Sequence, residues 1–94
     1  METLFLSQNV LSIEPGSYRV DTEKSFRSIA IAKQCHNIII SMGMHQYYFD
    51  ENGEFMCIVK ASRRVDMSIT KNNELLDFLM ELLRNGEYTR LHSM

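Results

Sequence analysis

The sequence predicts an α+β fold, an antiparallel sheet of three to five strands with two helices packed on one of its faces. An Asn-Gly pair stands between two runs of β-favouring residues, which is typical of a β-hairpin. Two other segments repeat apolar residues every three or four positions, as a helix with one buried side does. The expected order is therefore helix, three strands, helix, preceded by a short β arm.

The predicted hairpin turns at Asn52-Gly53, between the strand sequences QYYF and FMCIV. Both turn residues tolerate the positive φ that tight hairpin turns require. A two-residue turn would place Glu51 opposite Glu54, and two like charges in that position destabilise a hairpin. A type I turn that starts at Asp50 and is followed by a left-handed Gly53 avoids this pair. We therefore expect the second arrangement.

The β arm occupies the first 20 residues in this prediction. Pro15 fixes the φ of the first central position of a turn, and Gly16 can take the positive φ of the second. Residues 14–17 are thus expected to form a type II turn. Residues 18–20 would then return beside residues 11–13, as a second hairpin or as an irregular arm that adds one strand to the sheet edge.

The first helix is predicted over residues 22–37. Asp21 or Thr22 can cap it, and Glu23 carries a negative charge where the helix dipole favours one. The β-branched run at residues 38–40 also suits a strand, which leaves the end of this helix open. The expected buried stripe consists of Phe26, Ile29, Ala32, Cys35, Ile39 and Met42.

The last part of the core holds a third strand and a second helix. Residues 65–69 alternate between apolar and polar types, which predicts a strand. Asn72 or Asn73 is expected to cap a helix that ends at Gly86. Its buried stripe consists of Leu75, Leu76, Leu79, Leu82 and Leu83. The chain is then a single domain over residues 1–94, with an arm (1–20), a core (21–86) and a tail (87–94) that either docks or frays.

Composition and charge exclude several classes of protein. A hydrophobic fraction of 45% and a charged fraction of 23% are typical of a folded globular domain. A net charge of −2 leaves no electrostatic basis for nonspecific binding to nucleic acids. We expect Cys35 and Cys57 to be buried free thiols in a reducing compartment. The sequence shows no signal peptide and no apolar stretch long enough to span a membrane, which predicts a cytoplasmic protein.

No set of residues has the spacing of a catalytic, cofactor or metal site. His36, His45 and His92 lie far apart in the sequence, without acidic or thiol ligands at metal-binding spacing. Cys57 and His45 form the only nucleophile and base pair that can be constructed, and their strand positions are not directly opposed. We therefore expect no enzymatic activity, no cofactor and no bound metal.

The predicted architecture leaves one face of the sheet uncovered. Tyr48, Val59 and Phe55 are expected on that face, and an exposed apolar patch of this kind often marks an interface. The sequence thus predicts a small interaction module that forms a homodimer and acts as an inhibitor or adaptor by binding a protein partner. Many virus-encoded accessory proteins are of this type.

An alternative function is binding of RNA or single-stranded DNA. Arg63 and Arg64, with Lys60 before them, form the main basic cluster of the chain. Tyr47 is expected close to this cluster, and single-stranded nucleic acids are held by base stacking on aromatic rings together with phosphate contacts. These four residues are the candidate nucleic-acid site.

Overall fold

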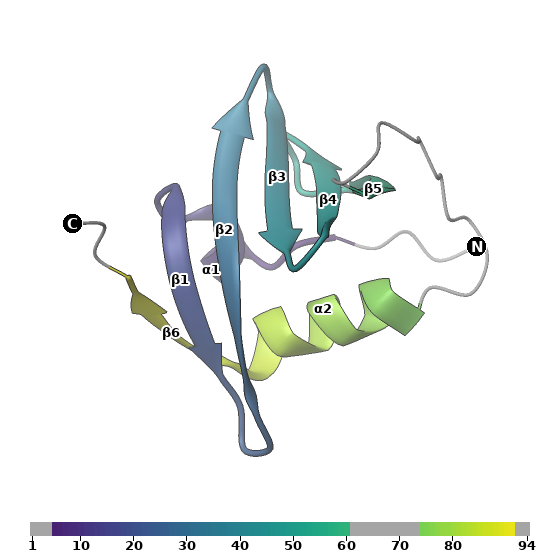
Figure 1. Cartoon of the computed structure of the whole chain (residues 1–94). Helices are drawn as coiled ribbons and strands as arrows, with labels where there is room; N and C mark the ends of the chain where they lie inside the picture. Colours follow the sequence, from purple (N-terminus) through teal and green to yellow (C-terminus); the bar gives the residue numbers. More distant parts are fainter. Residues whose placement is uncertain (1–4, 61–73, 92–94) are drawn as a thin grey trace.

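The computed structural model describes residues 5–60 and 74–91. Within these ranges six strands form one antiparallel sheet in the order β5-β4-β3-β2-β1-β6 (Figure 1). Each strand from β1 to β5 lies beside its neighbours in sequence, and β6 pairs with the outer side of β1. The elements are α1 (Gln8–Leu11), β1 (Gly16–Asp21), β2 (Phe26–Gln34), β3 (Asn37–Met42), β4 (His45–Asp50), β5 (Phe55–Lys60), α2 (Glu74–Asn85) and β6 (Glu87–Arg90).

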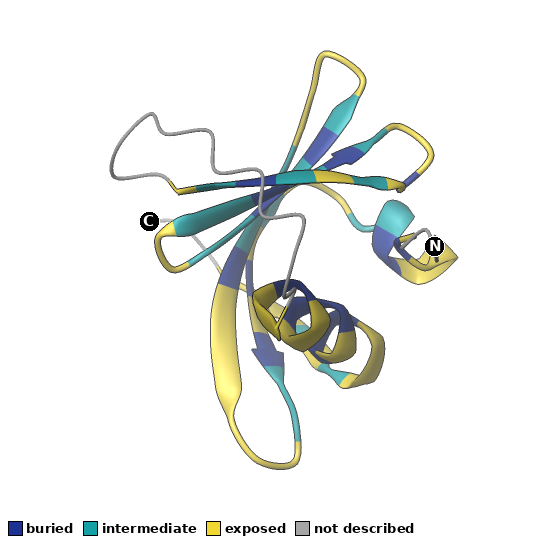
Figure 2. Ribbon diagram, turned by 90° about the vertical axis from the view of Figure 1, so that its right-hand side faces the viewer, coloured by how far each residue is buried: buried dark blue, intermediate teal, exposed yellow. Residues whose placement is uncertain are grey.

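The hydrophobic core lies between α2 and one face of this sheet, which we call the inner face. Alternate residues of each strand point to it because successive side chains of a strand point to opposite faces. The core also contains Leu6 and Val10 from the N-terminal segment, and both helices lie on this side of the sheet (Figure 2). The sheet supplies Tyr18, Val20, Ile29, Ile31, Ile38, Ile40, Tyr47, Phe49 and Ile58, and α2 supplies Leu76, Leu79, Met80, Leu82 and Leu83.

The predicted arrangement of two helices on a sheet of three to five strands is wrong, because residues 22–37 do not form a helix. Residues 22–25 form a turn between β1 and β2, and β2 starts at Phe26. Strand β2 pairs over six residues with β1 and over six residues with β3. Hydrogen bonding on both sides and the burial of Ile29 and Ile31, two positions apart, favour the strand over the helix.

A two-residue turn at Cys35-His36 joins β2 to β3. Both residues have positive φ, 48° for Cys35 and 68° for His36, and the flanking Gln34 and Asn37 pair with each other. This geometry is that of a type I′ turn, which matches the twist of the two strands. The turn lacks the Asn-Gly signal that usually marks such hairpins, and it lies where the sequence predicted the end of a helix.

The predicted N-terminal β arm is also wrong. Ser7 caps the short helix α1, where its Oγ accepts a hydrogen bond of 3.4 Å from the Val10 amide. Strand β1 starts at Gly16 and pairs with β2 and β6, not with residues 11–13. It therefore lies inside the sheet, and α1 is held beside β2 by a 2.8 Å hydrogen bond from Lys33 Nζ to the carbonyl of Leu11.

The structure confirms the hairpin at Asn52-Gly53 and the expected type I turn that starts at Asp50. Gly53 has a φ of 89°, and its amide donates a 2.9 Å hydrogen bond to the carbonyl of Asp50. The Asp50 Oδ1 accepts 2.9 Å hydrogen bonds from the amides of Asn52 and Glu54. An acid at the start of the turn thus satisfies two amides that the hairpin leaves unpaired.

The predicted second helix is confirmed as α2, and Gly86 follows its last residue. The predicted tail contains a strand, since β6 pairs with β1 through residues such as Tyr88, which lies opposite Val20. The predicted strand at 65–69 and the helix cap at 72–73 lie outside the described residues. No helix in the described ranges has the length and apolar character needed to cross a bilayer.

Candidate interaction surface on the open sheet face

The face of the sheet opposite α2, which we call the open face, carries an uncharged area across four strands. Ile39 on β3 lies between Ala32 and Tyr48, and Tyr48 in turn pairs with Cys57 on β5. A second, parallel row of side chains runs beside this one. The two rows together form the uncharged patch, which consists of Ala30, Ala32, Ile39, Ser41, Gln46, Tyr48, Cys57 and Val59, all of them half-buried.

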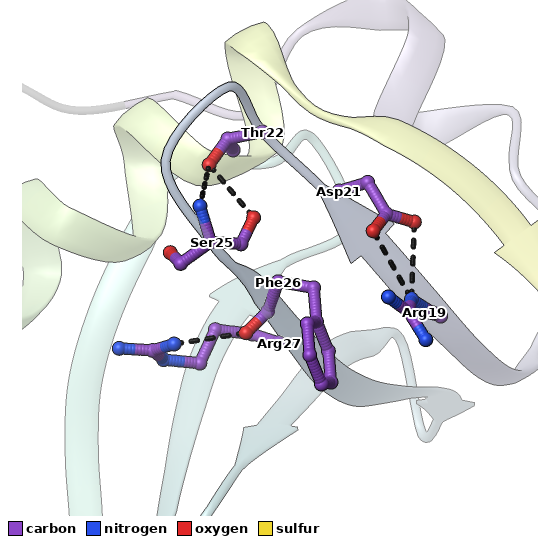
Figure 3. Close-up of polar contacts among 6 residues, drawn as sticks. All are labelled: Arg19, Asp21, Thr22, Ser25, Phe26 and Arg27. Carbon is purple, nitrogen blue, oxygen red and sulfur yellow. Dashed lines mark hydrogen bonds and ion pairs between the residues drawn. The ribbon is translucent and has the colours of Figure 1, made fainter.

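An exposed aromatic ring and an arginine lie on the same face, at the far end of β1 and β2. Phe26 is 50% exposed, and the guanidinium of Arg19 lies 3.8 Å from its ring centroid. The Nε of Arg19 also donates to both carboxylate oxygens of Asp21, at 3.1 and 3.2 Å (Figure 3). The ion pair with Asp21 restrains the Arg19 guanidinium. The guanidinium and the Phe26 ring therefore form a preorganised pair.

The turn next to this pair is held by its own hydrogen bonds. The amide of Thr22 donates to the carbonyl of Ser25 at 2.8 Å. The Thr22 Oγ1 donates to the same oxygen at 2.9 Å (Figure 3). The Ser25 amide donates in return to the Thr22 Oγ1 at 3.3 Å. These three bonds restrain the turn, and the Phe26 side chain that follows it is presented from a defined backbone.

Two of the three residues predicted for partner binding lie on the open face. Tyr48 and Val59 belong to the uncharged patch, whereas Phe55 packs against the core with its ring centroid 5.7 Å from that of Phe49. The register of β5 shifts between the positions opposite Tyr48 and Phe49. This irregularity inserts one residue, so the alternation reverses and Phe55 faces inward with Phe49.

The structure does not bring the four candidate nucleic-acid residues together. Tyr47 is 0% exposed, so no base can stack on its ring, and burial raises the pKa of its hydroxyl. Lys60 is exposed at the end of β5. Arg63 and Arg64 lie outside the described residues. Of the four, Lys60 is the one that the structure places on the surface.

The structure separates the Cys57 thiol from the His45 imidazole. Cys57 lies on the open face opposite Tyr48, while His45 lies beside the buried Tyr47 on the inner side of β4. The His36 Nδ1 is 3.2 Å from a Glu51 carboxylate oxygen, and both side chains are exposed. In the described part of the chain no three His, Cys, Asp or Glu side chains are grouped so as to hold a metal ion.

Several residues of this surface were missed from the sequence, among them Phe26, Ile39 and Arg19. Phe26 and Ile39 had been placed in the buried stripe of a helix, and Arg19 in a β arm. A signal was present, since Phe26, Ser28, Ala30 and Ala32 alternate with Arg27, Ile29, Ile31 and Lys33. This period of two separates the residues of the open face from those of the inner face.

No protein-family model, curated protein or solved structure matches this chain. The geometry of the open face is therefore the basis of the functional proposal.

Proposed function

We propose that this protein is a non-enzymatic interaction module that binds a protein partner through its open face and acts as an inhibitor or adaptor. The observation that carries the proposal is the uncharged patch next to the exposed Phe26 and Arg19 pair. The centres of protein interfaces are depleted in charged residues, and Tyr, Phe and Arg are enriched there. Tyrosine and arginine also supply much of the binding energy where they are well packed.

The distribution of charge around the patch supports the same function. Asp50 stands at one end of it, where β4 ends, and Arg19 and Asp21 stand beyond its other end. A dry centre with a charged periphery is the usual arrangement of an interface, because rim charges stay hydrated while the centre loses its water.

The size of the patch indicates how much of the face takes part. Four strands span about 14 Å at the usual spacing of neighbouring strands. A stable interface buries about 800 Å² on each partner, which is more than the patch alone offers. The contact must therefore extend along β1 and β2 to Phe26. Such a partner would cover most of the open face.

Binding by this face predicts a simple mode of action. Strands β1 to β4 each pair with a strand on both sides, and side-chain hydrogen bonds fix the turns at both ends of the face. A preformed surface loses little conformational entropy on binding. The module would act by occupying a surface of its partner, so its effect should depend on binding alone.

Affinity capture with the Tyr48→Glu variant tests this proposal. The substitution places a charge in the uncharged patch, and its matched control is Phe78→Glu, which makes a similar change on α2, where Phe78 is 40% exposed. We expect partners captured by the wild type and by Phe78→Glu to be lost with Tyr48→Glu. Equal thermal stability of the two variants shows that both are folded. The proposal fails if Tyr48→Glu retains the partners that the control retains.

A further inference from the structure

We propose that the open face binds a second copy of this chain, with the two faces packed about a two-fold axis. In this dimer the Phe26 and Arg19 pair of each copy lies on the uncharged patch and on Asp50 of the other copy. The inference rests on the proposed function of the open face and names its partner.

The two halves of the proposed contact lie at different positions on the open face. Phe26 and Ala32 lie six residues apart on β2, which is about 20 Å along a strand. Arg19 on β1 lies three strands from Asp50 on β4, about 14 Å across the sheet. The Phe26 and Arg19 pair and the far part of the uncharged patch, around Ala32 and Asp50, are therefore at opposite corners of the open face, too far apart to meet within one chain.

Arg19 and Asp50, at the two corners, carry opposite charges. A two-fold axis midway between the corners brings each corner onto the opposite corner of the other copy. Arg19, which also pairs with Asp21 of its own chain, then meets Asp50 twice in the dimer, once in each direction. Within the described chain, the Asp50 Oδ1 accepts two turn amides, whereas no hydrogen bond reaches its Oδ2.

The side chains at the centre of the open face are small. The axis would pass close to Ala30 and Ser41, which pair with each other on β2 and β3. Both side chains are small and uncharged, so nothing at this point keeps two sheets from the distance of about 10 Å at which packed sheets lie. The larger Tyr48 and Phe26 side chains lie to either side of the axis and fill the space there.

Mixing two oppositely charged variants tests the pairing, with sedimentation velocity over a series of protein concentrations as the measurement. The Arg19→Asp variant would place Asp against Asp50 in its own dimer, and Asp50→Arg would place Arg against Arg19. We expect the wild type to dimerise, each variant alone to be monomeric, and the mixture of the two to dimerise. Dimerisation of each variant alone overturns the proposed pairing.

A cross-link through the axis provides a second test that does not depend on the charged residues. In a chain with Cys35→Ser and Cys57→Ser, the Ala30→Cys variant should be joined into a covalent dimer by a bis-maleimide of about 10 Å span. Thr89→Cys is the matched control, because it lies on the same face but on the edge strand β6. Equal cross-linking of both variants, or none of Ala30→Cys, overturns the geometry.

The two proposals can fail separately. If the wild type stays monomeric at every concentration and Ala30→Cys gives no cross-link, the second copy is excluded as the partner. The function of the open face then still stands if Tyr48→Glu abolishes capture of a different protein. If Tyr48→Glu alters neither self-association nor capture, both proposals are wrong.

Discussion

The hydroxyls of the buried Tyr47 and the half-buried Tyr88 differ in their hydrogen bonding. Tyr47 is 0% exposed, and no group of the described residues 5–60 and 74–91 forms a hydrogen bond with its hydroxyl. The hydroxyl of Tyr88, by contrast, donates a 2.7 Å hydrogen bond to the carbonyl of Leu83. The two side chains therefore differ in whether their polar atom is satisfied, and the same substitution should have opposite effects at the two positions.

The magnitude follows from the cost of burying an unpaired polar group, which is about 1 to 3 kcal/mol. Tyr47→Phe removes this group and keeps the ring, which lies across from Ile40 and Ile58 in the neighbouring strands. We expect the free energy of unfolding to rise by about 1 kcal/mol or more. For a domain of this size that corresponds to an increase in Tm of about 4 to 8 °C per kcal/mol.

Urea denaturation measures the change, with the slope m expected to stay constant because the same surface is exposed on unfolding. Tyr88→Phe serves as the control and should lower the free energy of unfolding by about 1 kcal/mol, since it removes a formed hydrogen bond. If Tyr47→Phe destabilises the protein as much as Tyr88→Phe does, the Tyr47 hydroxyl has a partner in solution, such as a buried water, and the reasoning is wrong.

Three further predictions concern the turns and the C-terminal segment. Replacing Cys35-His36 by Asn-Gly should stabilise the fold by about 1 kcal/mol, because both positions have positive φ; a lower Tm in calorimetry would contradict this turn geometry. Burial raises the pKa of Tyr88 from 10.0 to about 12, so the folded state holds this proton more tightly and stability should fall as the pH rises from 10 to 12. Denaturation at several pH values should show a smaller fall for Tyr88→Phe, and an unchanged fall would rule out this cause. Gly86→Ala should destabilise by about 1 to 3 kcal/mol, because its Cβ would collide with Val20 Cγ1; an unchanged urea midpoint would contradict the close packing of β6 on β1.

The parts of the fold that were predicted correctly depend on local chemistry. The hairpin at Asn52-Gly53 follows from turn residues that need no distant partner, and its register follows from avoiding a pair of like charges. Helix α2 follows from a leucine stripe of consistent period that ends at Gly86. In both cases the signal and the structure it specifies lie within a few residues of each other.

The segment 22–37 was mispredicted because its apolar residues fit two periods. Phe26, Ile29 and Ala32 repeat as a helix does, while Ile29 and Ile31 repeat as a strand does. The strand forms because β1 and β3 offer hydrogen bonds along both edges of β2, and such tertiary pairing overrides a weak local preference. The turn that makes this pairing possible, at Cys35-His36, uses residues that do not predict a turn.

The candidate interaction surface depends on the same distinction between periods. A helix places Phe26 and Ile29 on one buried stripe, whereas a strand places them on opposite faces, because they are an odd number of positions apart. Phe26 is 50% exposed and Ile29 is 3% exposed, as the strand requires. The irregularity in β5 reverses the alternation once more and moves Phe55 into the core. The composition of the open face is thus set by register, and a shift of one residue in any strand would exchange its binding side chains for core side chains.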